Sequence, residues 1–371
     1  FPVRISFSKS VTESLLAKIR SGEMMSRNEK FNLIIQLSIP SILAQVTTVL
    51  MFYIDAGMVG SLGAEPSAAI GLVEPATWLF FSLVSAVTMG FSVQVAHFIG
   101  ANDFANARAV MRHGYVFGLC FSLFLLLITF LIGFRLPAWL GGGADIQHDA
   151  TVYFLIFSLI IPFHLIEYMS AAMLKVSGDM RRPSSMAILM CILDVVFNYF
   201  FIFPTRTITL FGMEITMPGL GEGVAGAALG SLLSFVCVAL PLAYYAIFQS
   251  PILAWKLDVE RFVWRWQYIW NAMKIGAPMA LQYLLMNGAQ LVSTMIVAPL
   301  GNISIAAHSF AITAESLCYM PGYGISEAAT TLVGQSVGAD RRELHRSFAW
   351  MTVSLGMVVM AFMGVVMYIF A

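Results

Sequence analysis

Two acidic residues, Asp55 and Asp194, lie within long apolar stretches of this sequence and are the residues best suited to do chemistry. A carboxylate in a spanning helix costs about 2.5–3.5 kcal/mol on insertion scales, so it is a functional candidate by default. Asn198 follows Asp194 by four residues and therefore shares its helical face. Together these groups could bind Na⁺ or form a proton relay. The alternatives are a helix-end acid touching water at Asp55, and a hydrogen bond between helices at Asp194 and Asn198.

The composition predicts that these residues belong to membrane-spanning helices. The chain has 371 residues, of which 59% are hydrophobic and 11% charged, and its mean hydropathy is +0.83. A soluble domain is about half apolar and a quarter charged, so we expect an all-α integral membrane protein. Nine stretches are long enough to cross about 30 Å of hydrocarbon. They lie at about 32–58, 69–98, 114–134, 150–175, 184–204, 222–248, 271–299, 305–337 and 348–370.

Basic residues predict the orientation of these spans. Eighteen of the twenty Lys and Arg fall in the N-terminal tail or in alternate loops, and only Arg135 and Arg206 fall on the other side. The N-terminus is therefore expected in the cytoplasm, where SVTESLLAKIR forms either a short amphipathic helix or a frayed tail. This assignment places Lys175 in a loop and leaves only acids in the spans, so the interior should be acidic. The acids counted within spans are Asp55, Glu167, Asp194, Glu315 and Glu327.

An internal repeat organises the spans. A shift of 238 residues pairs Pro40 with Pro278, and the glycines at 63 and 100 with those at 301 and 338. Such residues mark kinks or close helix approaches. Six spans fit one period, so the two helix bundles are parallel repeats, a transporter architecture with its site between the halves. We expect twelve helices in a full-length protein, and this chain to be a truncated product. The expected parts are a cytoplasmic tail (1–30), a six-helix N-lobe (31–250), an inter-lobe cytoplasmic linker (251–270) and a three-helix partial C-lobe (271–371).

Three segments resemble the multidrug and toxic compound extrusion (MATE) family, with the DinF-like branch most similar. They are IPSILAQVTTVLMFYIDAGMVGSLG, GVAGAALGSLLS and AAHSFAITAESLCYMPGYGISEAATTLVGQSVGAD, and the resemblance extends across all nine expected helices. It implies two six-helix bundles and outward export of mostly cationic, amphipathic compounds. Inward movement of H⁺ or Na⁺ would drive this export.

The resemblance also implies roles for particular residues. Asp55 matches the family's first-helix acid, a ligand of the coupling ion, and Ser231 matches a sixth-helix hydroxyl, with simple close packing as its alternative. The family pattern at Asp194 and Asn198 reads Asn first and Asp second, so the order is reversed here. Pro40 is where the family is proposed to bend on protonation, and a static kink is the alternative.

The second half offers a polar surface for cargo. Gln282, Tyr283 and Asn287 give one expected helix a polar side, and Glu315 lies near mid-depth on the next. We expect these four residues to line a substrate cavity, with Glu315 either attracting a cationic substrate or making a buried structural hydrogen bond. Some MATE branches carry a seventh-helix glutamate that this chain lacks. Glu167 and Glu327 lie nearer the cytoplasmic ends and are expected to be structural.

These observations favour an antiporter in the bacterial cytoplasmic membrane that exports organic cations and xenobiotics by multidrug efflux. Its coupling residues would be Asp55, Asp194, Asn198 and Ser231, with Na⁺ as a candidate metal at the first three. We expect a monomer in the bilayer with no cofactor besides H⁺ or Na⁺, no enzymatic activity and, at zero net charge, no nucleic-acid partner. The alternative is a flippase for lipid-linked saccharides, which should place Arg or Lys in its cavity for pyrophosphate. A membrane hydrolase would need paired catalytic groups at one surface.

Overall fold

A computed structural model describes residues 9–210, 213–257 and 262–370. Within these residues, seven helices are long and apolar enough to cross a membrane, or eight if the pair bent by 41° between α6 and α7 is one span. The long helices are α2 (Arg27–Gly60), α3 (Ala64–Gly100), α4 (Phe104–Gly133), α6 (Gln147–Ser158), α7 (Ile160–Val176), α8 (Arg181–Ile202), α9 (Gly223–Tyr244), α10 (Trp266–Val297), α11 (Asn302–Gly338) and α12 (Arg342–Phe370). The shorter elements are α1 (Lys9–Ser21), α5 (Leu136–Trp139), β1 (Pro204–Leu210), β2 (Met213–Leu220), η1 (Tyr245–Gln249), η2 (Trp255–Leu257) and η3 (Ala298–Leu300).

The internal repeat is visible in the backbone. The bounds of α11 are those of α3 shifted by 238 residues at both ends. Gly63 and Gly301, which precede these helices, have φ values of 125° and 98°. Asn102 and Asp340, which follow them, have φ values of 59° and 53°, and these are the non-glycine residues with positive φ in the described chain. The two halves therefore begin and end their second helix with the same turn geometry.

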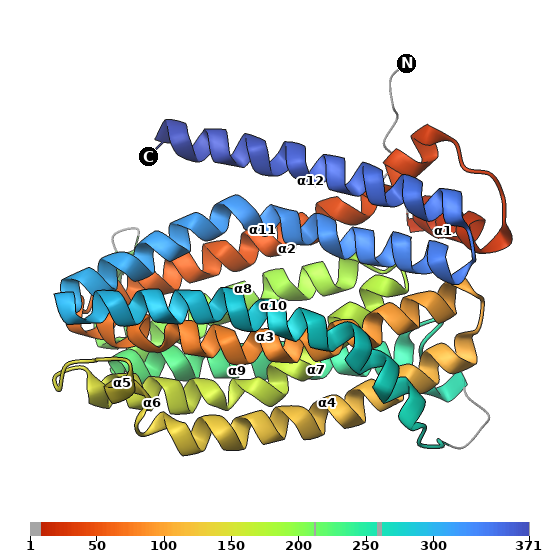
Figure 1. The fold of residues 1–371 in the computed structure, drawn as a ribbon. Helices are drawn as coiled ribbons and strands as arrows, with labels where there is room; N and C mark the ends of the chain where they lie inside the picture. The colour runs from red at the N-terminus through yellow and green to blue at the C-terminus, as the bar shows by residue number, and fades with distance from the viewer. Residues whose placement is uncertain (1–8, 211–212, 258–261, 371) are drawn as a thin grey trace.

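The two halves pack against each other through equivalent pairs of helices. In Figure 1, α3 and α11 run through the middle of the molecule, α2 lies against α11, and α10 lies against α3. Because α10 and α11 are the repeat equivalents of α2 and α3, each half presents the same two helices to the other. Helix α12 lies outside α11, and most of its apolar side chains are exposed. The all-α membrane fold with two lobes is thus confirmed.

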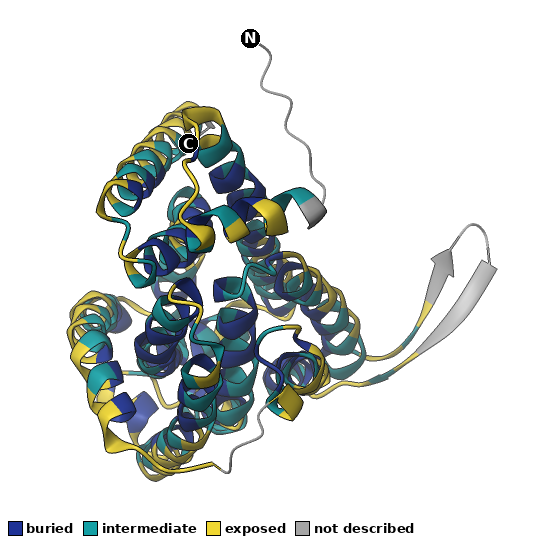
Figure 2. Cartoon of the chain, turned by 90° about the vertical axis from the view of Figure 1, so that its right-hand side faces the viewer, coloured by how far each residue is buried: buried dark blue, intermediate teal, exposed yellow. Residues whose placement is uncertain are grey.

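The two ends of the helical body differ in charge and shape. We call the end that carries α1 and residues 100–104, 176–181 and 338–342 the basic end. The opposite end, with residues 60–64 and 202–223, is the hairpin end. There β1 and β2 form an antiparallel pair, and the coloured segments that lead into it extend away from the helical body (Figure 2). Long apolar runs do not predict this hairpin, although the segment TRTITL alternates in the way strands do.

The N-terminal segment forms a short amphipathic helix, which was one of the two alternatives expected from the sequence. Helix α1 lies across the basic end in the end-on view of Figure 2. Leu15, Leu16 and Ile19 are buried in a cluster with residues of α2, α11 and α12. Apolar residues at this spacing fall on one face of a helix, which explains why α1 forms where it can cover the other helices.

Candidate functional site

The acids predicted from the sequence meet near the hairpin end. The side-chain nitrogen of Asn198 donates to Asp55 Oδ1 (2.8 Å) and to Asp194 Oδ2 (2.9 Å). Asp194 and Asn198 are fully buried, whereas Asp55 is half-buried. The carboxyl groups of Asp55 and Asp194 also contact each other. Residues 143 positions apart, Asp55 and Asn198, therefore form one polar cluster, which we call the Asp55–Asp194 cluster.

Small residues of α9 bring a further hydroxyl into the cluster. A Cβ atom at Gly230 would overlap Asn198, and one at Gly226 would overlap the carbonyl of Phe201, so α9 can pack this closely on α8 only with glycine at both positions. Ser234 then donates to Asp194 Oδ1 at 3.2 Å. Ser231, the predicted hydroxyl, is 8% exposed and also contacts Asp194. Ser234 was missed, although its place one turn after Ser231 was a usable signal.

The cluster holds oxygen atoms suited to a hard cation. It contains two carboxylates and two hydroxyls, and the side-chain oxygen of Asn198 is buried without a hydrogen-bond partner. Oxygen-only sets of this kind suit hard ions rather than transition metals. Across the described part of the chain there is no group of three or more His, Cys, Asp or Glu side chains that could hold a metal ion.

A cavity connects this cluster with the basic end. Its volume is about 230 Å³, and it is lined by residues of α2, α3, α6, α7, α8, α9 and α11. Asp55, Asn198 and Ser231 line it near the hairpin end, and Lys175 and Glu327 line it near the basic end. The cavity is therefore lined mainly by helices of the N-lobe, with α11 of the second half forming one wall, and it extends from the Asp55–Asp194 cluster toward the basic end.

The cavity also contains an acid that was not among those predicted from the sequence. Glu74 of α3 lines the cavity and is half-buried. Its Oε2 accepts a hydrogen bond from Ser309 of α11 (2.9 Å), and its Oε1 accepts one from Trp78 (3.4 Å). Glu74 falls inside the expected span 69–98, so the signal that singled out Asp55, a carboxylate in an apolar stretch, applied here equally.

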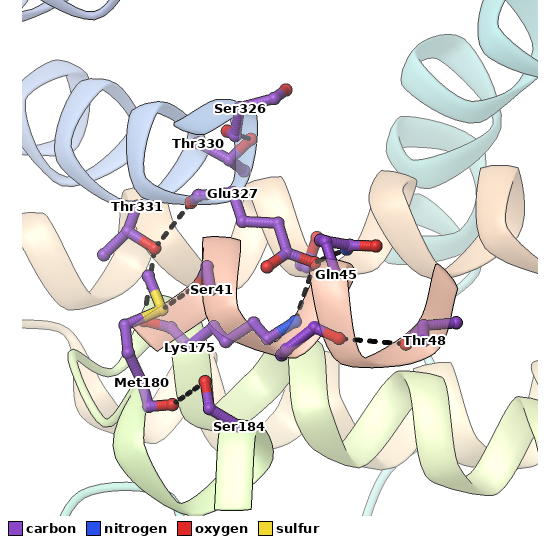
Figure 3. A network of polar contacts seen from close by, with 12 residues as sticks. Ser41, Gln45, Thr48, Lys175, Met180, Ser184, Ser326, Glu327, Thr330 and Thr331 are labelled. Carbon is purple, nitrogen blue, oxygen red and sulfur yellow. Dashed lines mark hydrogen bonds and ion pairs between the residues drawn. The ribbon is translucent and has the colours of Figure 1, made fainter. Parts of the chain in front are cut away.

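One basic residue reaches the cavity, which corrects the expectation of a purely acidic interior. Lys175 lies in the last turn of α7 rather than in a loop, and its Nζ is 2.7 Å from Glu327 Oε1. The side chain of Gln45 donates to the same oxygen (3.4 Å), and Thr331 donates to the Lys175 carbonyl (3.1 Å). Figure 3 shows this network between α2, α7 and α11. The ion pair links the two lobes, as a structural role for Glu327 would require.

The four polar residues expected to line a substrate cavity have varied surroundings, and their role stays a prediction. Gln282 and Glu315 are exposed, and Tyr283 and Asn287 are half-buried. Asn287 donates to Ser82 of α3 (3.0 Å), because this side of α10 packs against α3 of the first half. None of the four belongs to the lining of the cavity described above.

Pro40 lies inside α2, which continues without a break on both sides. The next residues, Ser41 and Ile42, touch Gly324 of α11 so closely that a Cβ atom there would lie 2.6 Å from the Ile42 nitrogen. The helix therefore loses one internal hydrogen bond at the point where the two lobes approach. The hinge at Pro40 stays a prediction.

Two parallel helical repeats, together with a cavity lined by ionisable side chains, define a class of protein, the secondary transporters. Within that class, the MatE family model matches residues 40–200 and 278–371, and the chain belongs to this family. The DinF-like branch stays a prediction, since the relatives reported below carry another name.

Curated relatives are similar over most of this chain. The probable multidrug resistance protein NorM of Neisseria meningitidis serogroup A is 26% identical over 322 residues, which cover 86% of this chain and 67% of that protein. The probable NorM of Pseudomonas aeruginosa is 30% identical over 322 residues, covering 83% of this chain and 61% of that protein. The chain thus spans about two thirds of the length of these relatives.

Solved structures share the fold. An outward-facing multidrug resistance MATE family transporter of the MOP superfamily has a TM-score of 0.78 and 22% identity, covering 95% of this chain and 72% of that one. A MATE in complex with MaD3S has a TM-score of 0.77 and 22% identity, covering 95% and 73%.

Proposed function

We propose that this protein is a multidrug efflux transporter that exports organic cations and related xenobiotics in exchange for H⁺ or Na⁺. The observation that carries the proposal is the contact between Asp55 and Asp194, bridged by Asn198 at the wall of the cavity. Membership of the MatE family and the multidrug resistance names of the relatives support the same reading.

The chemistry of the cluster suits ion exchange. Two ionised carboxylates in contact repel each other, so a proton or a cation between Asp55 and Asp194 stabilises the pair. Asp55 lines the cavity whereas Asp194 is buried behind it, so an ion reaching the pair from the cavity meets Asp55 first. Gain or loss of that ion changes the charge that the cavity presents to cargo. Ion and cargo then need only compete for one charge or one conformation to be coupled.

Asn198 allows the cluster to accept either ion. Its amide nitrogen now donates to both carboxyl groups, an arrangement that needs no metal. Rotating the amide would place its unpartnered oxygen beside the two carboxylates, giving Na⁺ three oxygen ligands with the Ser231 and Ser234 hydroxyls nearby. The reversed order of Asp and Asn on α8 keeps both chemical groups on the same helical face.

The setting of the transporter follows from the charge distribution. We place the basic end in the cytoplasm because basic loops stay inside, and the whole body in the bacterial cytoplasmic membrane as a monomer. No cofactor besides the coupling ion enters the proposal. The lipid-linked saccharide alternative gains one base, Lys175, but Glu327 already neutralises it at 2.7 Å.

Dye efflux from vesicles tests the proposal. The chain is reconstituted in vesicles loaded with a fluorescent organic cation, and a pH gradient is imposed first, then a sodium gradient. We expect one of the two gradients to accelerate efflux and its collapse by an ionophore to stop it. Efflux that ignores both gradients would contradict ion coupling, and the absence of any efflux would contradict the export function.

A further inference from the structure

We infer that Glu74, and not the Asp55–Asp194 cluster, binds the positive charge of the cargo. This inference rests on the proposed function and adds to it a division of labour within one cavity. A small ion would occupy the closed cluster on α2 and α8, while an organic cation would occupy a second subsite on α3. The second subsite is centred on the Glu74 carboxylate, which accepts hydrogen bonds from Ser309 and Trp78.

Glu74 is an acid whose hydrogen-bond donors are neutral. Its oxygens accept from a serine hydroxyl and an indole nitrogen, and no Lys or Arg of the described chain forms an ion pair with it. Its fellow cavity acid Glu327 is neutralised by Lys175. A carboxylate placed in a span costs insertion free energy, and at Glu74 no charge in the described protein offsets that cost. A cationic ligand bound at Glu74 would offset it.

The surroundings of Glu74 suit an organic cation better than a bare ion. Trp78, which donates to Glu74, makes an edge contact with Phe52 at 5.0 Å between ring centroids and another with Phe81 at 6.3 Å. All three rings line the cavity with Glu74. Aromatic faces attract cations and pack against apolar groups. This part of the cavity therefore offers both a charge partner and an apolar surface to an organic cation. The Asp55–Asp194 cluster instead surrounds its acids with amide and hydroxyl groups.

The subsite also spans the two lobes. Ser309 belongs to α11, and its Cβ lies so close to α3 that a Cβ atom at Gly71 would be 2.9 Å from it. The hydrogen bond to Glu74 therefore forms only while α3 and α11 are tightly packed at this level. A cargo cation that takes over the carboxylate competes with this bond and loosens an inter-lobe contact. Cargo binding is thus linked to the lobe movement that export requires.

Equilibrium binding tests the inference without any ion gradient. The purified chain in lipid nanodiscs is titrated with tetraphenylphosphonium, an aromatic cation, and with triphenylphosphine oxide, a neutral aromatic compound. We expect Glu74→Gln to weaken tetraphenylphosphonium binding about tenfold, the size expected for losing one charged contact in a half-buried site. Triphenylphosphine oxide should bind equally to the unchanged chain and to Glu74→Gln. Glu65→Gln is the matched control, because Glu65 lies exposed on the same helix outside the cavity.

Ser309→Ala provides a second variant that keeps the carboxylate and removes its inter-lobe donor. We expect it to bind tetraphenylphosphonium as well as the unchanged chain or more tightly. Equal binding of tetraphenylphosphonium by Glu74→Gln and Glu65→Gln would overturn the inference, as would loss of binding in Ser309→Ala or no binding by the unchanged chain. Binding that depends on Glu74 in a chain whose efflux ignores both ion gradients would support the subsite while contradicting the proposed coupling.

Discussion

Gly100 of α3 and Gly338 of α11 are repeat equivalents, and each presses against the backbone of the other's helix. A Cβ atom at Gly100 would overlap the carbonyl of Gln335, and one at Gly338 would overlap the carbonyl of His97. Gln335 and His97 are themselves repeat equivalents. The two lobes therefore meet at the basic end through a contact that obeys the internal two-fold relationship, and no side chain fits between the helices there.

This crossing predicts the effect of adding one methyl group. Gly100→Ala and Gly338→Ala should each destabilise the protein by about 1–3 kcal/mol, because a tightly packed contact tolerates no extra carbon. Gly356→Ala is the control, since a Cβ atom there meets nothing within 4 Å and alanine favours the helix. Thermal unfolding in detergent measures all three. If Gly100→Ala melts at the temperature of Gly356→Ala, the close approach is not needed for stability.

The reversed order of Asp194 and Asn198 predicts that the pair acts as a unit. Asp194→Asn and Asn198→Asp should each lose ion-driven efflux, the first by removing a carboxylate and the second by removing the amide that bridges two carboxylates. The double exchange Asp194→Asn with Asn198→Asp restores one acid and one amide on the same face of α8. It should recover a substantial part of the efflux rate in vesicles. A double variant no better than the worse single variant would show that each position has its own fixed role.

The Lys175–Glu327 ion pair predicts strong coupling between its partners. Removing one partner leaves a mostly buried charge, so Lys175→Gln or Glu327→Gln should each cost about 3 kcal/mol, the lower end for buried pairs. The double variant should cost much less than the sum of the two. Thermal unfolding of the four proteins completes the cycle, and exposed Lys256→Gln serves as the control. Additive effects would mean that the two charges do not interact in the membrane.

Helix α1 is predicted to hold the two lobes together at the basic end. Ile19 is fully buried, and Arg341 of the second lobe donates to the carbonyls of Lys18 (3.0 Å) and Glu23 (2.7 Å). Ile19→Ala should cost about 2–4 kcal/mol by leaving a cavity in this cluster and should speed hydrogen exchange in α1. Ser14→Ala on the exposed face is the control, because its hydroxyl bonds only locally, to Val11. Unchanged exchange in Ile19→Ala would mean that α1 is held by other contacts.

The sequence predicted those features that follow from periodicity and charge. Equivalent Pro and Gly residues indicated the repeat, and the insertion cost of an acid indicated Asp55 and Asp194, which indeed meet. It failed where side-chain direction decides. The direction of a polar residue on α10 depends on helix rotation, which no local pattern records, so the bond from Asn287 to Ser82 of α3 could not be predicted. Glu74 had a usable signal, but its partner Ser309 is 235 residues away.

The central claim, that the Asp55–Asp194 cluster couples an ion to export, is tested most directly by removing one charge. Asp55→Asn keeps the size of the side chain, and Asp149→Asn, an exposed acid of α6, is the matched control. Both are reconstituted in vesicles, where gradient-driven efflux of an organic cation is measured alongside its equilibrium binding. We predict that Asp55→Asn binds the cation but no longer responds to the gradient, whereas Asp149→Asn does both. Gradient-driven efflux of undiminished rate in Asp55→Asn would contradict the account.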